Sequence, residues 1–71
     1  MSSFTIDEIC TISRTERGAW GKVFIKIGNE TYTYNFSYMS LELTVIPDHE
    51  DKLSFLDKRL LNNLVMDHLW K

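Results

Sequence analysis

The chain has 71 residues, a net charge of −2 and a hydrophobic content of 44%, which is the composition of one small globular domain spanning residues 1–71. This charge excludes a protein whose whole surface grips nucleic acid, and it is too small for an acidic mimic of DNA. Cys10 is the single cysteine, so an intramolecular disulfide is excluded, and no Cys/His spacing indicates structural zinc. We therefore expect a good core or a partner subunit to stabilise the domain.

The N-terminal stretch has no basic region followed by an apolar run, so we expect no secretory signal. No apolar stretch approaches the roughly 20 residues that are needed to span a bilayer. A lone cysteine fits a reducing compartment. These features predict a cytoplasmic protein that does not associate with a membrane.

The first segment, Phe4–Ser13, is rich in isoleucine and threonine, but its alternation of apolar residues changes parity between Ile6 and Ile9. A strand with a bulge near Asp7-Glu8 explains that change. The alternative is a single helical turn, because Thr5–Glu8 matches a capping box. The β-branched content favours the strand.

The stretch from Trp20 to Tyr38 predicts a β-hairpin, which a polar connection over Arg14–Gly18 joins to the first segment. Gly28-Asn29 suits a two-residue type II′ turn, because glycine accepts a positive φ at the first central position. Counting outward from this turn gives one set of apolar or aromatic cross-strand pairs: Ile25–Tyr32, Val23–Tyr34, Gly21–Phe36 and Ala19–Tyr38. The alternate set is Lys26–Thr31, Phe24–Thr33, Lys22–Asn35 and Trp20–Ser37. A slip of one residue would mix the two sets.

After the hairpin the alternation changes parity again, and a new apolar set follows: Leu41, Leu43 and Val45. Met39-Ser40 is a poor sequence for a tight turn. The stretch Tyr32–Ile46 is therefore either one bent strand with a bulge or two strands joined by an irregular turn. Pro47 ends it, because proline has no N–H to give to the ladder.

The segment Ser54–Trp70 predicts the one strong helix, and Ser54 with Asp57 resembles a capping box at its start. An apolar stripe at helical spacing is expected to face the core: Leu53, Leu56, Leu60 and Leu64, with Leu61 on its flank. Apolar residues continue around the far end of the helix. We therefore expect the helix to contact its own sheet and a second neighbour, such as another subunit.

These elements together predict an α+β fold: an antiparallel β-meander of three to four strands with one C-terminal α-helix packed on one face. If the helix covers the face that carries Val23 and Tyr34, the opposite face presents a candidate site in which aromatic residues alternate with lysines. Its members are Trp20, Lys22, Phe24 and Lys26, with Asn35 beside them.

Three interpretations of that face compete. In the first interpretation, a loop or the first segment covers the aromatic rings. In the second, the face binds protein, because exposed apolar patches mark interaction surfaces. In the third, single-stranded nucleic acid stacks its bases on the rings while the lysines hold phosphates.

The candidates for catalysis are weak. Cys10 lies in a strand without a basic neighbour in sequence, His49 lies among acidic residues in a solvated loop, and His68 suits the negative end of the helix dipole. No phosphate loop, nucleophile elbow or dinucleotide fingerprint is present. We expect no catalytic residue, no metal, no cofactor and no small-molecule substrate.

The sequence thus predicts a non-enzymatic protein that binds another protein, with a homodimer preferred. Regulators, inhibitors and accessory proteins, including those carried by phages and mobile elements, are often small acidic domains of this build. The alternative is single-stranded nucleic-acid binding through Trp20, Lys22, Phe24 and Lys26.

Overall fold

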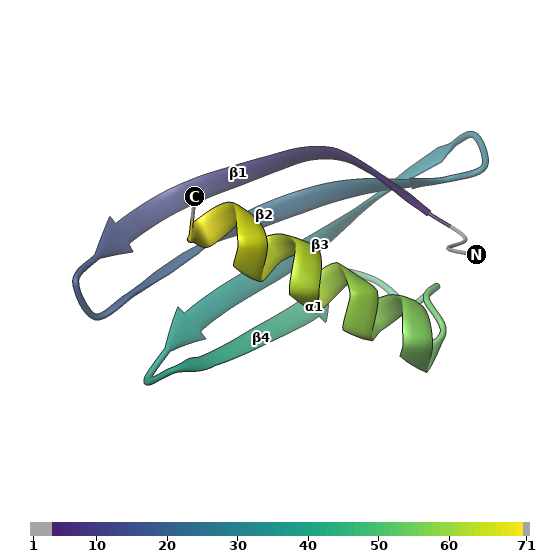
Figure 1. The fold of residues 1–71 in the computed structure, drawn as a ribbon. Coiled ribbons are helices and arrows are strands. Elements are labelled where there is room, and N and C mark those ends of the chain that lie inside the picture. Colours follow the sequence, from purple (N-terminus) through teal and green to yellow (C-terminus); the bar gives the residue numbers. More distant parts are fainter. Residues whose placement is uncertain (1–3, 71) are drawn as a thin grey trace.

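Four consecutive antiparallel strands and one helix make up the computed structural model, which describes residues 4–70 (Figure 1). The strands pair in the order of the chain, so the sheet is a meander. The elements are β1 (Thr5–Thr15), β2 (Gly18–Ile27), β3 (Glu30–Met39), β4 (Glu42–Pro47) and α1 (Phe55–Leu69). The predicted α+β fold is confirmed, with four strands.

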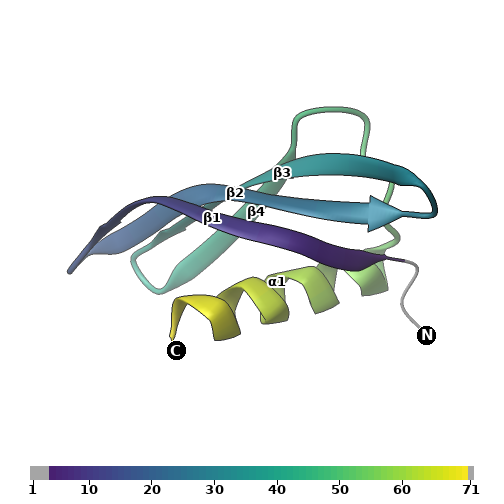
Figure 2. The same ribbon diagram turned by 90° about the horizontal axis from the view of Figure 1, so that it is seen from above.

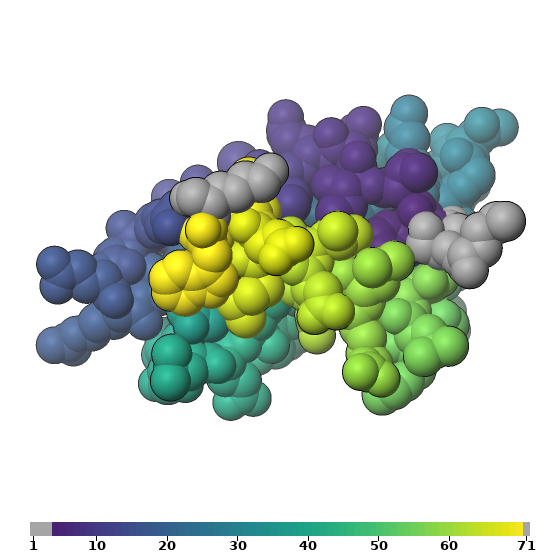
Figure 3. All heavy atoms as spheres, in the orientation of Figure 1, coloured from purple at the N-terminus to yellow at the C-terminus, as the bar shows by residue number. Residues whose placement is uncertain are grey.

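The two layers are a twisted sheet and a helix that lies along one of its faces. Figure 2 shows α1 beside this face, and the chain after β4 rises on the other side before it returns to α1. Figure 3 shows α1 seated between β1 and β4, with the β1–β2 turn projecting beyond it. The side chains that are most completely buried come from β2, β3 and α1: Val23, Ile25, Tyr34, Phe36, Leu61 and Val65.

The β2–β3 hairpin has the predicted register at every position, from Ile27 opposite Glu30 to Ala19 opposite Tyr38. Gly28 has a φ of 64°, and Asn29 does not share this positive value. A positive φ at the first central position is the mark of a type II′ turn, whose twist matches that of the flanking strands. The expected turn is therefore confirmed.

Gly21 lies where β1, β2 and the Phe36 ring come closest together. A Cβ added at Gly21 would lie 2.1 Å from the carbonyl oxygen of Cys10 and 2.9 Å from the Cζ atom of Phe36. The Cys10 carbonyl belongs to the backbone of the neighbouring strand and the Phe36 ring is buried, so neither can move aside for a side chain at this position. The absence of a side chain at this position is therefore a requirement of the sheet.

The first segment is a strand with a bulge, as expected, and the alternative helical turn is wrong. The pairing of β1 with β2 shifts register between Ile6 and Glu8, and again between Thr11 and Ser13. Bulges increase local twist and interrupt the row of free backbone groups along an edge strand. The second bulge was not predicted.

The stretch Tyr32–Ile46 is two strands, β3 and β4, rather than one bent strand. Ser40 and Leu41 form the turn between them, with φ values of 53° and 67°. Two positive φ values in a two-residue loop are typical of a type I′ turn, which ordinarily has Asn-Gly. This tight turn, rather than the irregular one expected, produces the observed change of parity, because Tyr38 then lies opposite Leu43.

The helix begins where the sequence predicts. The Ser54 hydroxyl oxygen accepts a hydrogen bond of 3.2 Å from the backbone N–H of Asp57. The backbone of Ser54 is extended and that of Phe55 is helical, which is the geometry of an N-cap.

The rotation of α1 about its own axis differs from the prediction. The helical residues that face the sheet are Leu61, Val65 and Leu69. Leu53, which precedes α1, is buried, but Leu56 is 71% exposed, and Leu60 and Leu64 lie on the exposed side. The predicted core stripe is therefore wrong beyond Leu53.

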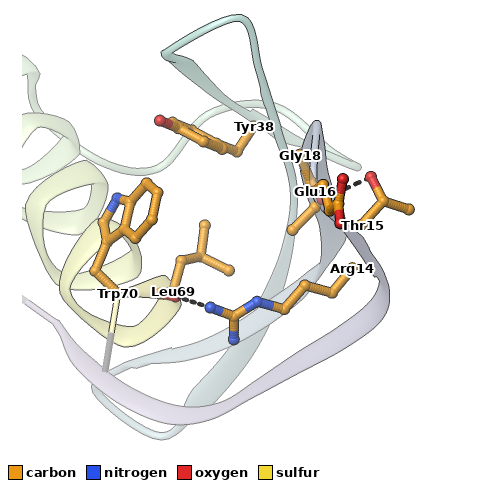
Figure 4. A pocket seen from close by; sticks show the side chains of 8 residues that line it. Arg14, Thr15, Glu16, Gly18, Tyr38, Leu69 and Trp70 are labelled. Carbon is orange, nitrogen blue, oxygen red and sulfur yellow. Dashed lines mark hydrogen bonds between the residues drawn. The ribbon is translucent and has the colours of Figure 1, made fainter.

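Polar contacts at both ends of α1 explain this rotation. Near its start, Lys58 Nζ lies 2.7 Å from Asp51 Oδ2. At its end, Arg14 Nη2 donates a hydrogen bond of 2.5 Å to the carbonyl oxygen of Leu69 (Figure 4). The Trp70 ring also meets the Tyr38 ring edge-on, with 5.7 Å between centroids, at a hollow of about 210 Å³. These contacts depend on β1, β3 and the β4–α1 loop, which a helical wheel does not contain.

The β4–α1 loop is docked on the buried Tyr34. The Tyr34 hydroxyl donates to Asp51 Oδ1 at 2.8 Å, and the same oxygen accepts from the Leu53 N–H at 3.0 Å. The His49 ring packs against Tyr32 and Tyr34, with centroids 4.9 and 5.3 Å away. His49 lies in a loop, as expected, but its ring is half-buried against these two tyrosine rings rather than solvated.

The contacts between Tyr34, Asp51 and Lys58 shift the pKa values of Tyr34 and Asp51. Burial, followed by the hydrogen bond to Asp51, raises the pKa of Tyr34 to about 12. Burial alone would raise the pKa of Asp51, but hydrogen bonds from Lys58, Leu53 and Tyr34 outweigh it, and the pKa of this carboxyl is lowered.

Replacing Gly21 is expected to destabilise the fold. Gly21→Ala places a methyl group 2.1 Å from a backbone oxygen, so we expect a loss of about 3 kcal/mol in the free energy of unfolding. Gly28→Ala is the comparison, because open space surrounds Gly28 and only its positive φ opposes a side chain; it should cost about 1 kcal/mol. Urea denaturation of both variants measures the difference, and equal losses would contradict the close approach at Gly21.

Replacing Ser40-Leu41 by Asn-Gly is expected to stabilise the protein by about 1 kcal/mol, because glycine and asparagine adopt positive φ at low cost. Leu41 is 87% exposed, so its removal sacrifices little packing. Thermal unfolding of the double variant should show a raised Tm. An unchanged or lower Tm would mean that these side chains make contacts that offset the strain of the turn.

The Tyr34 hydroxyl is expected to make stability depend on alkaline pH. Its pKa is raised above the ordinary 10.0, so its contribution is complete below pH 10 and is lost as the pH rises toward about 12. Tyr34→Phe should cost about 1 kcal/mol at neutral pH and should flatten the fall in stability across that window. Urea denaturation from pH 7 to pH 12 tests this, with Tyr38→Phe, on the same strand, as the control.

Candidate interaction surface

The outer face is the side of the sheet that points away from α1, and Trp20 is the largest exposed side chain on it. Trp20 is 52% exposed, so no segment within residues 4–70 encloses its indole. Its cross-strand partners on this face are the small polar residues Ser13 and Ser37, which leave the ring standing above its surroundings. The interpretation in which a loop or the first segment covers the rings is wrong for Trp20.

The other predicted residues share the outer face but differ in exposure. Lys26 is exposed, whereas Lys22, Phe24 and Asn35 are half-buried. Trp20, Lys22 and Asn35 line one common hollow, and Phe24 and Lys26 lie farther along β2 toward Gly28. The sheet therefore brings three of the five predicted residues together and leaves two beside them.

Two isoleucines on the outer face were not predicted. Ile12 and Ile46 are both exposed, and both line the hollow beside Trp20. The alternation along the chain could not place Ile12, because it lies in the second bulge of β1. Ile46 lies opposite Asn35, so it could have been found only once the turn at Ser40-Leu41 was known.

Trp20 is a ridge with a hollow on each side along β2. The hollow toward Lys22 has a volume of about 410 Å³, and its apolar walls include Ile12 and Ile46. The hollow toward the hairpin turns has a volume of about 680 Å³ and lies over Gly18. Further residues of its lining are Thr15, Arg17, Met39 and Ser40.

Charges of both signs lie on the outer face. Glu8 is the cross-strand partner of Phe24 and so lies on the same side of the sheet. It therefore lies between the two positions of β2 from which Lys22 and Lys26 project. The Asn35 side-chain amide donates a hydrogen bond to the Asp48 carboxylate. The face is therefore apolar at its centre and electrostatically mixed around it.

The three residues that were weighed for catalysis lie on separate elements. Cys10 is exposed on β1, opposite Lys22, His49 packs on the tyrosines of β3, and His68 lies in the last turn of α1. None of them lines either hollow of the outer face. Within residues 4–70, no group of three or more His, Cys, Asp or Glu side chains is placed to hold a metal ion.

In the part of the chain that the structure describes, no helix has the length and apolar character needed to cross a membrane. Comparisons with protein-family models, with curated proteins and with solved structures each returned no match.

Proposed function

We propose that this protein is a non-enzymatic binding module that docks its outer face onto another protein. In this role it regulates, inhibits or assists its partner by covering part of the partner's surface. The observation that carries the proposal is the exposed Trp20 indole between two hollows, with Ile12 and Ile46 beside it. An antiparallel sheet ordinarily presents polar residues on its solvent face, so an apolar centre on that face indicates a contact surface.

The anchors of the contact are Trp20 and Phe24, which lie on the same face of β2 with Lys22 between them. Truncating an aromatic anchor at the centre of an interface commonly costs about 2 kcal/mol or more of binding free energy. The surrounding small polar residues, such as Ser37 and Thr44, would exclude water around the anchors without contributing much energy themselves.

Two features of the outer face favour a protein partner over single-stranded nucleic acid, the alternative. Bases stack on aromatic rings, but Ile12 and Ile46 offer no π-face to them. Glu8 and Asp48 place negative charge beside the lysines that would hold phosphates. Mixed charge around an apolar centre is the usual composition of a protein interface.

The proposal predicts that Trp20→Ala and Phe24→Ala abolish partner capture without unfolding the protein. Immobilised wild-type and variant chains would be exposed to an extract of source cells and washed at low and at high salt, and the retained proteins identified by mass spectrometry. Trp70→Ala is the matched control, because Trp70 is 64% exposed but lies beside Tyr38 on the helix side. We expect a protein retained at high salt by the wild type and by Trp70→Ala, and lost from both outer-face variants.

Retention that survives both outer-face substitutions would overturn the proposal. So would binding of a fluorescent single-stranded oligonucleotide whose affinity falls steeply with salt and weakens in Lys22→Glu or Lys26→Glu, because that behaviour is diagnostic of phosphate contacts. The second result would support the nucleic-acid alternative on the same face.

A further inference from the structure

Resting on the proposed function, we infer that the outer face takes a second copy of this chain as its partner. The two copies are related by a two-fold axis, and the Trp20 indole of each enters the hollow lined by Ile12, Lys22 and Ile46 on the other. The resulting assembly is a face-to-face pair of sheets with one helix layer on each outside.

Shape is the first argument. A two-fold interface requires that the same patch contain both the projecting group and its receptor. The outer face meets this requirement, because Trp20 forms one wall of the 410 Å³ hollow and stands exposed next to it. A two-fold axis lying in the contact plane, midway between ridge and hollow, superposes each ridge on the hollow of the other copy.

Area is the second argument. β2 and β3 have 10 residues each, so they extend roughly 33 Å, and four strands side by side span roughly 19 Å. The face thus measures roughly 600 Å² in plan. Stable interfaces bury about 600–1,000 Å² on each partner, so burial of the whole face would reach the lower end of this range without any contribution from the helix.

Charge is the third argument. The outer face carries two lysines, Lys22 and Lys26, and carboxylates at Glu8, Glu42 and Asp48. Because neither sign dominates, a second copy of the same face is not repelled. The chain as a whole carries a net charge of only −2, and its free hollow is apolar where the indole would enter. Lys22, at the wall of that hollow, would lie beside the incoming ring, where a cation is favourable.

The first test is the solution mass of the wild type, Trp20→Ala and Trp70→Ala by light scattering across a dilution series. We expect the wild type and Trp70→Ala to pass between 8.4 kDa and twice that mass as concentration rises. Each dimer contains two Trp20 contacts, and loss of one anchor weakens binding by roughly 30-fold. Trp20→Ala should therefore weaken self-association by roughly 1,000-fold and remain monomeric.

The second test uses the reciprocity of the contact. Ile46→Lys blocks the hollow and leaves the Trp20 ring in place, whereas Trp20→Ala removes the ring and one wall of the hollow but keeps its apolar wall of Ile12 and Ile46. Neither variant should dimerise alone, but an equimolar mixture retains one contact, in which Trp20 of one copy meets Ile12 and Ile46 of the other. This heterodimer should be roughly 30-fold tighter than the pairing of Trp20→Ala with itself. Leu56→Lys, on the exposed side of α1, is the control and should dimerise like the wild type. Circular dichroism of each variant confirms that it is folded.

Three outcomes would overturn the inference: a wild type that is monomeric at every concentration, a dimer that survives Trp20→Ala, or a mixture of the two variants that shows no rescue. A monomeric wild type that still captures a different protein through Trp20 and Phe24 would leave the proposed function standing. A monomeric wild type that captures nothing through these residues would remove both.

Discussion

The pairing register of β2 with β3 is the constraint on which the rest of this structure depends. Side chains alternate between the two faces of a strand, so one register decides at once which residues meet the helix and which form the outer face. With Ile27 opposite Glu30, Val23 and Tyr34 lie under α1 while Trp20 and Phe24 point away from it. The turn at Gly28 maintains this register, since its positive φ suits a two-residue loop.

The helix is held in place by contacts from β1, β3 and the β4–α1 loop. Arg14 of β1 binds the carbonyl at the last residue of α1, and Asp51 joins Lys58 of α1 to Tyr34 of β3. These polar contacts and the buried face of α1 together select one rotation of a helix that is apolar on more than one side. One consequence is that Leu56 is exposed although it lies at helical spacing from Leu53.

The apolar centre of the outer face is assembled from strands that are distant in sequence. β2 supplies the ridge, β1 supplies Ile12 from within a bulge, and β4 supplies Ile46. When a helix covers only one face of an antiparallel sheet, the opposite face is expected to carry polar residues or to be covered by another segment. This chain instead has one apolar face that α1 covers and an opposite face whose centre, at Trp20, Ile12 and Ile46, is apolar and exposed.

The sequence by itself determined the β2–β3 hairpin, its turn, the first bulge, the start of α1 and the common side of β2 on which Trp20 and Phe24 lie, because each depends on local alternation, on capping chemistry or on the conformational range of glycine. Only the tertiary structure decided the rotation of α1, the docking of His49 and the convergence of Ile12 and Ile46 beside Trp20. Those features depend on the register between strands whose connecting turn has no recognisable turn sequence. They also depend on contacts between residues far apart in the chain. Ser40-Leu41 illustrates the reason: its sequence does not resemble that of a tight turn, yet pairing of β3 with β4 forces both residues to positive φ.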